Sequence, residues 1–200
     1  MGDHLDDLSV GGTGSADERE LLLDTAWALF CQSGYQAVGI DTVLAKAGVA
    51  KMTLYNHFDS KEDLIAAAME KKGNEILAGI DGVIAAAGTN PERRLLAVFD
   101  WLAGWFSSKG FSGCAFIKAV GEYTAAGDKP RKAAAAYKQG LQDRLQVLAV
   151  EAGVKSPALL ARQLMFLIDG ATVHADIRAN PVFAAEARTA AKSLIDAAMP

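Results

Sequence analysis

Histidine and cysteine are scarce in this sequence, and so are the motifs of catalytic and metal sites. Its 200 residues hold three histidines and two cysteines. They are scattered along the chain, at His4, His57, His174, Cys31 and Cys114. No HExxH or GxSxG motif occurs, and the adjacent carboxylates Glu62 and Asp63 stand at an expected helix start, where capping explains them. We therefore expect no catalysis, no metal and no cofactor. Two distant cysteines form no disulfide framework and fit a reducing cytosol.

Long apolar runs and an excess of positive charge are also missing. No apolar run reaches the roughly 18 residues that span a bilayer. The N-terminus lacks the basic-then-apolar order of a signal peptide. We therefore expect a cytoplasmic protein with no membrane partner. The formal net charge is -4, so a nucleic-acid-binding face would have to concentrate its positive charge locally.

The residues that are present have the composition of an all-α protein. Hydrophobic residues make up 51% and charged residues 22%, which indicates a globular chain. Alanine and leucine dominate the apolar set, and no alternating strand pattern occurs. Apolar spacing, together with breakers such as Gly48 and Pro91, predicts about nine helices. Their expected ranges are 15–33 (starting between 15 and 17), 40–47, 51–58, 61–87, 91–108, a short helix from 114, 131–152, 158–178 and 182–198.

Residues 34–64 carry the most informative motif. They read GYQAVGIDTVLAKAGVAKMTLYNHFDSKEDL. Two short helices flank a tight turn at Gly48, which is the arrangement of a helix-turn-helix. The second helix offers hydrogen-bond donors and an aromatic ring within two turns, a set that suits phosphates and base edges.

This segment resembles the N-terminal signature of the tetracycline-repressor (TetR) family. The matching elements are Gly34-Tyr35, Ala47-Gly48-Val49, the run Thr53–Phe58, and Lys61. The resemblance implies a transcription regulator of bacteria that a small apolar or amphipathic effector releases from a near-palindromic DNA operator. It further implies a helix-turn-helix DNA-binding domain at 15–60 and a larger helical domain for effector binding and dimerisation at 61–200. We interpret residues 1–14 as a mobile tail, or as a short arm that orders on a partner.

The resemblance also assigns DNA contacts to individual residues. The side chains expected to contact DNA are Thr42, Lys51, Met52, Thr53, Tyr55, Asn56, His57 and Lys61. Lys51 and Met52 occupy base-facing positions, and guanine is the base that a lysine suits best. Asn56 can reach a base or a phosphate. Thr53, Tyr55, His57 and Lys61 occupy phosphate positions, although His57 also fits a purely structural role. Gly39 and Ala50 stand where the family often has a capping serine or threonine, so we expect a weakly capped recognition helix.

The last two expected helices carry apolar faces that we interpret as a homodimer interface. The residues expected there are Leu160, Leu164, Leu167, Ile168, Ala171, Ala187, Ala191, Leu194 and Ile195. In this family two such helices from each subunit form a four-helix bundle, which places the two recognition helices about one DNA turn apart. The alternative is that these faces only close the core of the monomer.

Large aromatic residues in the middle of the chain indicate an apolar pocket with a few polar groups. The expected lining consists of Trp101, Trp105, Phe106, Phe116, Glu122, Tyr123, Phe166, Asp169 and His174. The alternative is that the aromatic side chains only fill the core. Cys114, at an expected helix start, is either a redox sensor or an inert buried thiol.

Two other functions stay open on the sequence alone. A protein of the same fold could activate transcription, or regulate it without a small ligand. An all-helical carrier of small molecules, or an enzyme, would also fit the composition, but not the signature in the recognition helix.

Overall fold

The structure is a computed structural model that describes residues 13–199, and within these residues the chain forms nine α-helices and no strand. The helices are α1 (Thr13–Ser33), α2 (Ile40–Ala47), α3 (Lys51–His57), α4 (Lys61–Ala86), α5 (Pro91–Phe106), α6 (Ala115–Glu122), α7 (Lys129–Glu151), α8 (Pro157–Arg178) and α9 (Val182–Ala198). The all-α prediction is therefore confirmed. The start predicted for the first helix is wrong, because α1 already includes Thr13 and Gly14. The rest of the predicted tail, residues 1–12, lies outside the described residues.

Local sequence signals explain several helix ends. The Ser60 hydroxyl accepts a hydrogen bond from the Asp63 N–H at 3.1 Å, which caps α4. The Asn90 side chain caps α5 in the same way, through the Arg93 N–H at 2.9 Å. The break predicted at residues 127–130 is placed slightly too late, because α7 begins at Lys129 and holds Pro130 in its first turn. Proline is accepted there because the first N–H groups of a helix have no partner within it.

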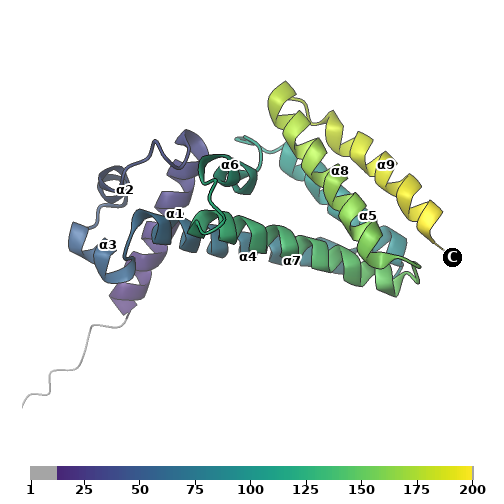
Figure 1. The fold of residues 1–200 in the computed structure, drawn as a ribbon, viewed down its shortest axis with the longest axis horizontal. Helices are drawn as coiled ribbons and strands as arrows, with labels where there is room; N and C mark the ends of the chain where they lie inside the picture. Colours follow the sequence, from purple (N-terminus) through teal and green to yellow (C-terminus); the bar gives the residue numbers. More distant parts are fainter. Residues whose placement is uncertain (1–12, 200) are drawn as a thin grey trace, which may run out of the picture.

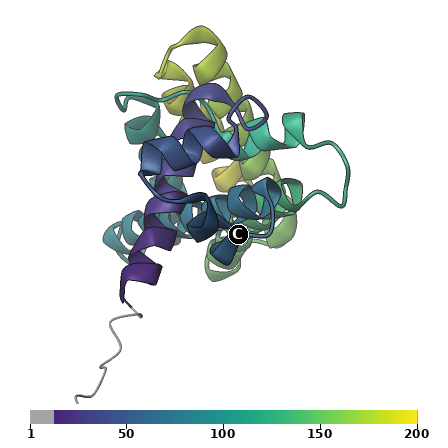
Figure 2. The same ribbon diagram turned by 90° about the vertical axis from the view of Figure 1, so that its left-hand side faces the viewer.

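The molecule is elongated (Figure 1). Helices α1, α2 and α3 gather at one end, α8 and α9 lie at the other, and α4 and α7 run side by side between them. Figure 2 views the molecule from the end that carries α1–α3 and shows the short helices α2 and α3 nearest the viewer. The two short helices are thus displayed at the tip of the long axis.

Two hydrophobic cores correspond to these two ends. The first, which includes Phe30, joins α1–α4 to α6 and to the start of α7. The second, which includes Phe99, joins the later part of α4 to α5, α7, α8 and α9. Helix α4 takes part in both cores, with Leu64 fully buried in the first and Ile80 buried in the second. Helix α7 also takes part in both cores, so α4 and α7 together link the helix-turn-helix end to the rest of the chain.

Candidate nucleic-acid interface and junction cavity

The helix-turn-helix is built around a small apolar core. Gly48 ends α2 with φ 70, a left-handed conformation that glycine adopts without the cost of a β-carbon. Val43 and Leu44 of α2 and Leu54 of α3 are buried. Leu54 is the one α3 residue that is fully buried, so the other faces of α3 are directed towards solvent.

The exposed part of α3 is a compact mixture of polar and apolar side chains. Lys51 and Asn56 are exposed, Tyr55 is 43% exposed, and Met52 is 70% exposed. Thr53 and His57 are half-buried on the same helix. Thr42, on the preceding helix α2, is exposed. The Lys51 ammonium lies 3.7 Å from the Asp41 carboxylate, but both side chains are mostly exposed, so this ion pair is weak and easily replaced. Ala50 and Gly39 provide no side-chain cap, as the sequence predicted.

Glu122 fastens α6 to the chain between α1 and α2. Its carboxylate accepts hydrogen bonds from the backbone N–H of Tyr35 at 3.0 Å and of Gln36 at 2.6 Å. Gly34 leaves room for this carboxylate, because a β-carbon there would lie 3.2 Å from Glu122 Oε1. The Tyr35 hydroxyl donates to the Ala115 carbonyl at 3.1 Å, so both ends of α6 hold this segment. Glu122 was predicted to line the pocket, and its partners show that it binds the segment between α1 and α2 instead.

Lys61 lies next to the same segment. Its ammonium donates to the Gln36 carbonyl at 3.2 Å. Burial lowers the pKa of Lys61, while the nearby Glu122 carboxylate acts in the opposite direction. Lys61 is thus separate from the α3 side chains and is held at the start of α4, half-buried, where it still reaches the surface.

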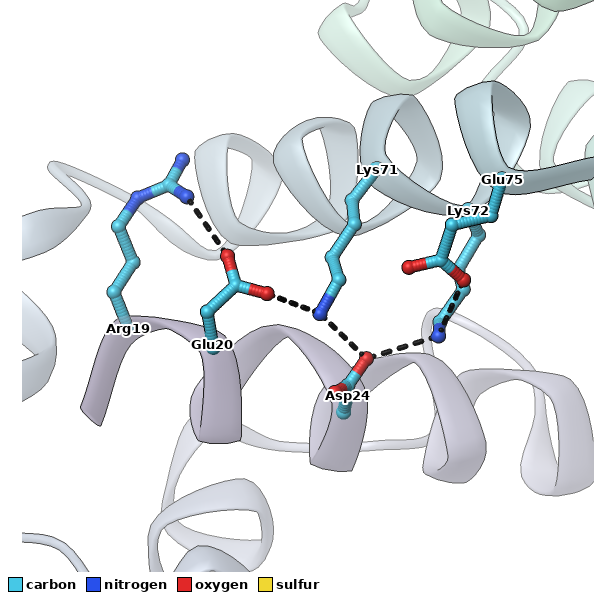
Figure 3. Close-up of polar contacts among 6 residues, drawn as sticks. All are labelled: Arg19, Glu20, Asp24, Lys71, Lys72 and Glu75. Atoms are coloured by element: carbon cyan, nitrogen blue, oxygen red, sulfur yellow. Dashed lines mark hydrogen bonds and ion pairs between the residues drawn. The ribbon is translucent and has the colours of Figure 1, made fainter. Parts of the chain in front are cut away.

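Opposite charges join α1 to α4 (Figure 3). Asp24 of α1 lies 2.9 Å from the ammonium groups of both Lys71 and Lys72 of α4. Glu20 also pairs with Lys71, and Glu75 pairs with Lys72 at 2.9 Å. The hydrogen bonds from Lys71 and Lys72 hold the pKa of Asp24 below its ordinary value. Sequence periodicity had no means of finding this network, because its two halves are 47 residues apart.

A cavity of about 290 Å³ lies where the two ends of the molecule meet. Three predicted pocket residues line it, namely Trp101, Trp105 and Phe116. Two residues of α1, Trp27 and Cys31, line it as well. The sequence analysis missed both. Their spacing of four residues puts them on one face of α1. Periodicity alone predicts that this face packs into the hydrophobic core, and it gives no sign of a cavity there.

Other predicted pocket residues lie elsewhere. Phe106 and Tyr123 are buried in the two cores and do not line the cavity. Phe166 is 71% exposed on the outer side of α8. His174 is exposed, with its ring 5.4 Å from the Phe183 ring between centroids. Asp169 forms an ion pair with Lys138 of α7 and, together with Phe116, lines a second cavity of about 250 Å³. The phase of α8 explains the positions of Phe166 and His174, because residues 166 and 174 are exposed whereas residues 164 and 168 are buried in the core.

The residues predicted for the dimer interface need a similar correction. Leu167 and Leu194 are half-buried against the core of the single chain. The others are buried inside that core, with at most 8% exposure, and are Leu160, Leu164, Ile168, Ala171, Ala187, Ala191 and Ile195. These side chains close the monomer, as the alternative interpretation held. The outer side of α8 carries a different apolar stripe, consisting of Leu159, Phe166, Val173 and Ile177 with exposures of 48, 71, 39 and 73%.

Within residues 13–199, no group of three or more histidine, cysteine, aspartate or glutamate side chains is arranged to hold a metal ion. No helix in the same part of the chain is long and apolar enough to cross a membrane.

Comparison with known proteins matches both the motif and the fold. The family model described as bacterial regulatory proteins, tetR family, matches residues 22–68. The HTH-type transcriptional activator FasR of Mycolicibacterium smegmatis is 33% identical over 89 residues, which are 43% of this chain and 41% of FasR. The HTH-type transcriptional repressor KstR of the same organism is 34% identical over 91 residues, 46% of this chain and 44% of KstR. The chain thus spans less than half the length of these curated relatives.

Solved structures match along almost the whole chain. A TetR-family transcriptional regulator from Streptomyces coelicolor has 29% identity and a TM-score of 0.80, covering 92% of this chain and 96% of that one. The reduced form of Escherichia coli NemR has 25% identity and a TM-score of 0.81, covering 88% and 96%. The similarity therefore extends beyond the helix-turn-helix to the helices that form the cavity and the C-terminal end.

Proposed function

Because the chain belongs to the TetR family of bacterial regulatory proteins, we propose that it is a sequence-specific DNA-binding transcription regulator whose recognition element is α3. The observation that carries the proposal is the composition of the exposed α3 surface. Met52 is 70% exposed and has no packing role that would explain an apolar side chain there. Lys51 and Asn56 flank it with polar groups. A thymine methyl group suits the methionine, and guanine and adenine edges suit the lysine and the asparagine.

Phosphate contacts would hold α3 in the major groove without reading sequence. Tyr55, Thr53 and His57 lie on α3 beside the base-reading residues, and Thr42 lies on the preceding helix. Lys61, at the start of α4, would hold a phosphate at the edge of the site, but it must first give up its bond to the Gln36 carbonyl. Binding should therefore weaken as salt rises, by an amount set by the number of phosphates neutralised.

The protein acts as a homodimer on a near-palindromic operator in this proposal. Leu159, Phe166, Val173 and Ile177 form an exposed apolar stripe on α8, at the end of the molecule opposite α3. Residues at intervals of three, four and seven share one face of a helix, and a stripe of this kind packs against a second helix. A twofold axis through it would leave both α3 helices free to enter neighbouring turns of the groove.

In the first candidate mode of regulation, a small apolar or amphipathic effector binds the protein and releases it from the operator. Regulation by activation is the second candidate, because the similar curated proteins include an activator as well as a repressor. As a regulator of bacterial genes, the protein would work in the cytoplasm.

The experiment is a selection of bound sequences from a random DNA pool at near-physiological salt, followed by titration of the enriched site. We expect a palindrome with half-sites about one helical turn apart. Lys51→Ala should weaken binding to that site by about 5- to 150-fold, from the roughly 1–3 kcal/mol of a base contact, and relax the choice of one base pair.

Lys46→Ala is the matched control, because Lys46 is an exposed lysine of the same helix-turn-helix and the charge change is identical. Equal losses for the two variants, without any change in the preferred sequence, would contradict the assignment of Lys51 to a base. The absence of any enriched sequence would contradict sequence-specific binding altogether.

A further inference from the structure

The cavity at the junction has walls from both ends of the molecule. Trp27 and Cys31 come from α1, which belongs to the helix-turn-helix end. Trp101 and Trp105 come from α5, and Tyr137 comes from α7. The connection between α5 and α6, residues 108–114, closes one side. A molecule in this cavity would therefore touch the DNA-binding end directly.

Six aromatic side chains line the cavity, namely Trp27, Trp101, Trp105, Phe111, Phe116 and Tyr137. The rings of Trp101 and Trp105 lie 5.6 Å apart between centroids. Phe111 meets Trp105 edge to face at 5.1 Å. On the other side Phe116 stacks on Tyr137 at 3.9 Å. Faces and edges in such arrangements favour a further flat ring, which gains apolar burial and ring–ring contact together.

The charged groups of the lining favour an anion over a cation. No aspartate or glutamate lines the cavity, and the one ionised side chain among the lining residues is that of Lys109. Burial raises the pKa of the Cys31 thiol to about 11, so this wall stays uncharged at neutral pH. A cation would therefore gain no carboxylate partner and would meet a lysine at the rim.

The volume of the cavity further restricts the class of ligand. A volume of about 290 Å³ is just below the range for ligand sites, roughly 300–1,000 Å³. One ring, or two fused rings, suits it. The larger groove of about 560 Å³ beside α3 is open and lined by Arg19, Asp59, Asp63 and Lys129 among others, so it resembles a solvated charged surface more than a ligand site.

We propose that the junction cavity is the effector site, and that its ligand is a small planar aromatic compound, neutral or anionic, which contacts the DNA-binding end through Trp27 and Cys31. This inference rests on the proposed function, because it names the class of ligand that would control the DNA binding of the proposed regulator.

The route from the cavity to α3 is short. The α5–α6 connection is held by a bond from Lys118 to the Ser112 carbonyl and by Asp176, which lies against Gly113. At the far end of α6, Glu122 binds the segment between α1 and α2. A ring that enters the cavity presses on α1 and on the start of α6. Both elements position the helix-turn-helix, so ligand and operator should oppose each other.

The chain provides its own probe of this site. It has three tryptophans, and all of them line the cavity, at Trp27, Trp101 and Trp105. The full chain labelled with 5-fluorotryptophan should therefore show ring binding as shifts of its ¹⁹F resonances. The three probes are 2-naphthol (neutral), 2-naphthoate (anionic) and N-methylquinolinium (cationic), which share a two-ring shape and differ in charge.

We expect 2-naphthol or 2-naphthoate to shift all three resonances and N-methylquinolinium to shift none at the same concentration. Equal or tighter binding of the cation would overturn the ligand class. Binding that broadens the probe's own ¹H signals but leaves the ¹⁹F resonances in place would put the site elsewhere, for example in the cavity of about 250 Å³ between α6 and α7. No binding by any of the three probes would overturn the site.

Two substitutions separate the two cavities. Cys31→Phe fills the junction cavity and should abolish ring binding. Val120→Phe fills the neighbouring cavity and should leave ring binding unchanged. The ¹⁹F experiment uses the chain without these substitutions. It therefore still decides where the ring binds if either variant fails to fold.

Regulation is tested with the selected operator. The bound ring should weaken operator binding by about 5- to 150-fold, and the operator should weaken ring binding by the same factor, because coupling is reciprocal. Ring binding that leaves operator affinity unchanged would refute the regulatory part of the inference. Failure to bind any operator would instead refute the proposed function and leave the ¹⁹F result to judge the site.

Discussion

Replacing Glu122 by glutamine should loosen the hold of α6 on the helix-turn-helix. The carboxylate of the wild type accepts two backbone N–H groups, those of Tyr35 and Gln36, with one oxygen each. Glutamine keeps one acceptor oxygen and turns an NH₂ group towards the second N–H. One hydrogen bond is lost, the other loses its charge assistance, and two donors face each other.

The size of the effect follows from the surroundings of the two bonds. A hydrogen bond to a charged group contributes about 1.5–3 kcal/mol when buried. The bond from Gln36 is exposed and that from Tyr35 is partly buried, which favours the lower end. We expect a loss of about 1–2 kcal/mol, with Glu122→Ala at the upper end of that range. For a chain of this size that corresponds to a fall in Tm of roughly 2–8 °C.

Two measurements test this loss. Thermal unfolding should give the change in Tm, with Glu70→Gln as the control, because Glu70 is an exposed glutamate of α4. Amide hydrogen exchange should localise the change, with the Tyr35 and Gln36 amides losing protection by about 5- to 30-fold while amides in the second core change less. If neither Glu122 variant differs from the control in Tm, and the two amides keep their protection, the carboxylate does not hold this segment.

Two further predictions concern the ends of the molecule. Asp24 has a lowered pKa because Lys71 and Lys72 donate hydrogen bonds to it, so its contribution to stability is present above about pH 4 and is lost as pH falls through the folded-state pKa. Asp24→Asn should therefore destabilise the protein in urea unfolding at pH 7, and a gap to wild type that is just as large at pH 3 would contradict the assignment. Phe166→Glu should convert the proposed dimer to monomers in sedimentation velocity without lowering Tm by more than about 2 °C, since a surface change off the core costs little. Leu21→Glu, at an exposed apolar residue of α1, should leave the dimer intact, and a Phe166→Glu protein that stays dimeric would remove α8 from the interface.

The parts of the fold that were predictable depend on neighbours in the chain. Ser60 caps α4 three residues before its partner Asp63, and Gly48 ends α2 through its own conformation. Such signals involve residues that are close together in the chain, so they can be recognised from the sequence alone. The start of α1 was missed because its first turn is polar and offers several candidate caps.

The parts that were not predictable depend on distant partners. Helix α8 is apolar on two sides, with Leu164 in the core and Phe166 exposed, and periodicity cannot decide which side closes the monomer. Glu122 acts on a segment 86 and 87 residues away, which no spacing rule reaches. Trp27 lines the cavity only because α5 and the α5–α6 connection fold over it.

The length of α4 has a consequence for any protein that reads DNA with the helices at its tip. The helix has 26 residues and is thus about 39 Å long at about 1.5 Å per residue. A lever of that length, tilted by about 5° at one end, moves its other end by about 3.4 Å, which is the rise of one base pair along a strand. A tilt of about 5° where α4 enters the second core would therefore shift α3 by about one step of the double helix. In a symmetric pair, the two shifts add.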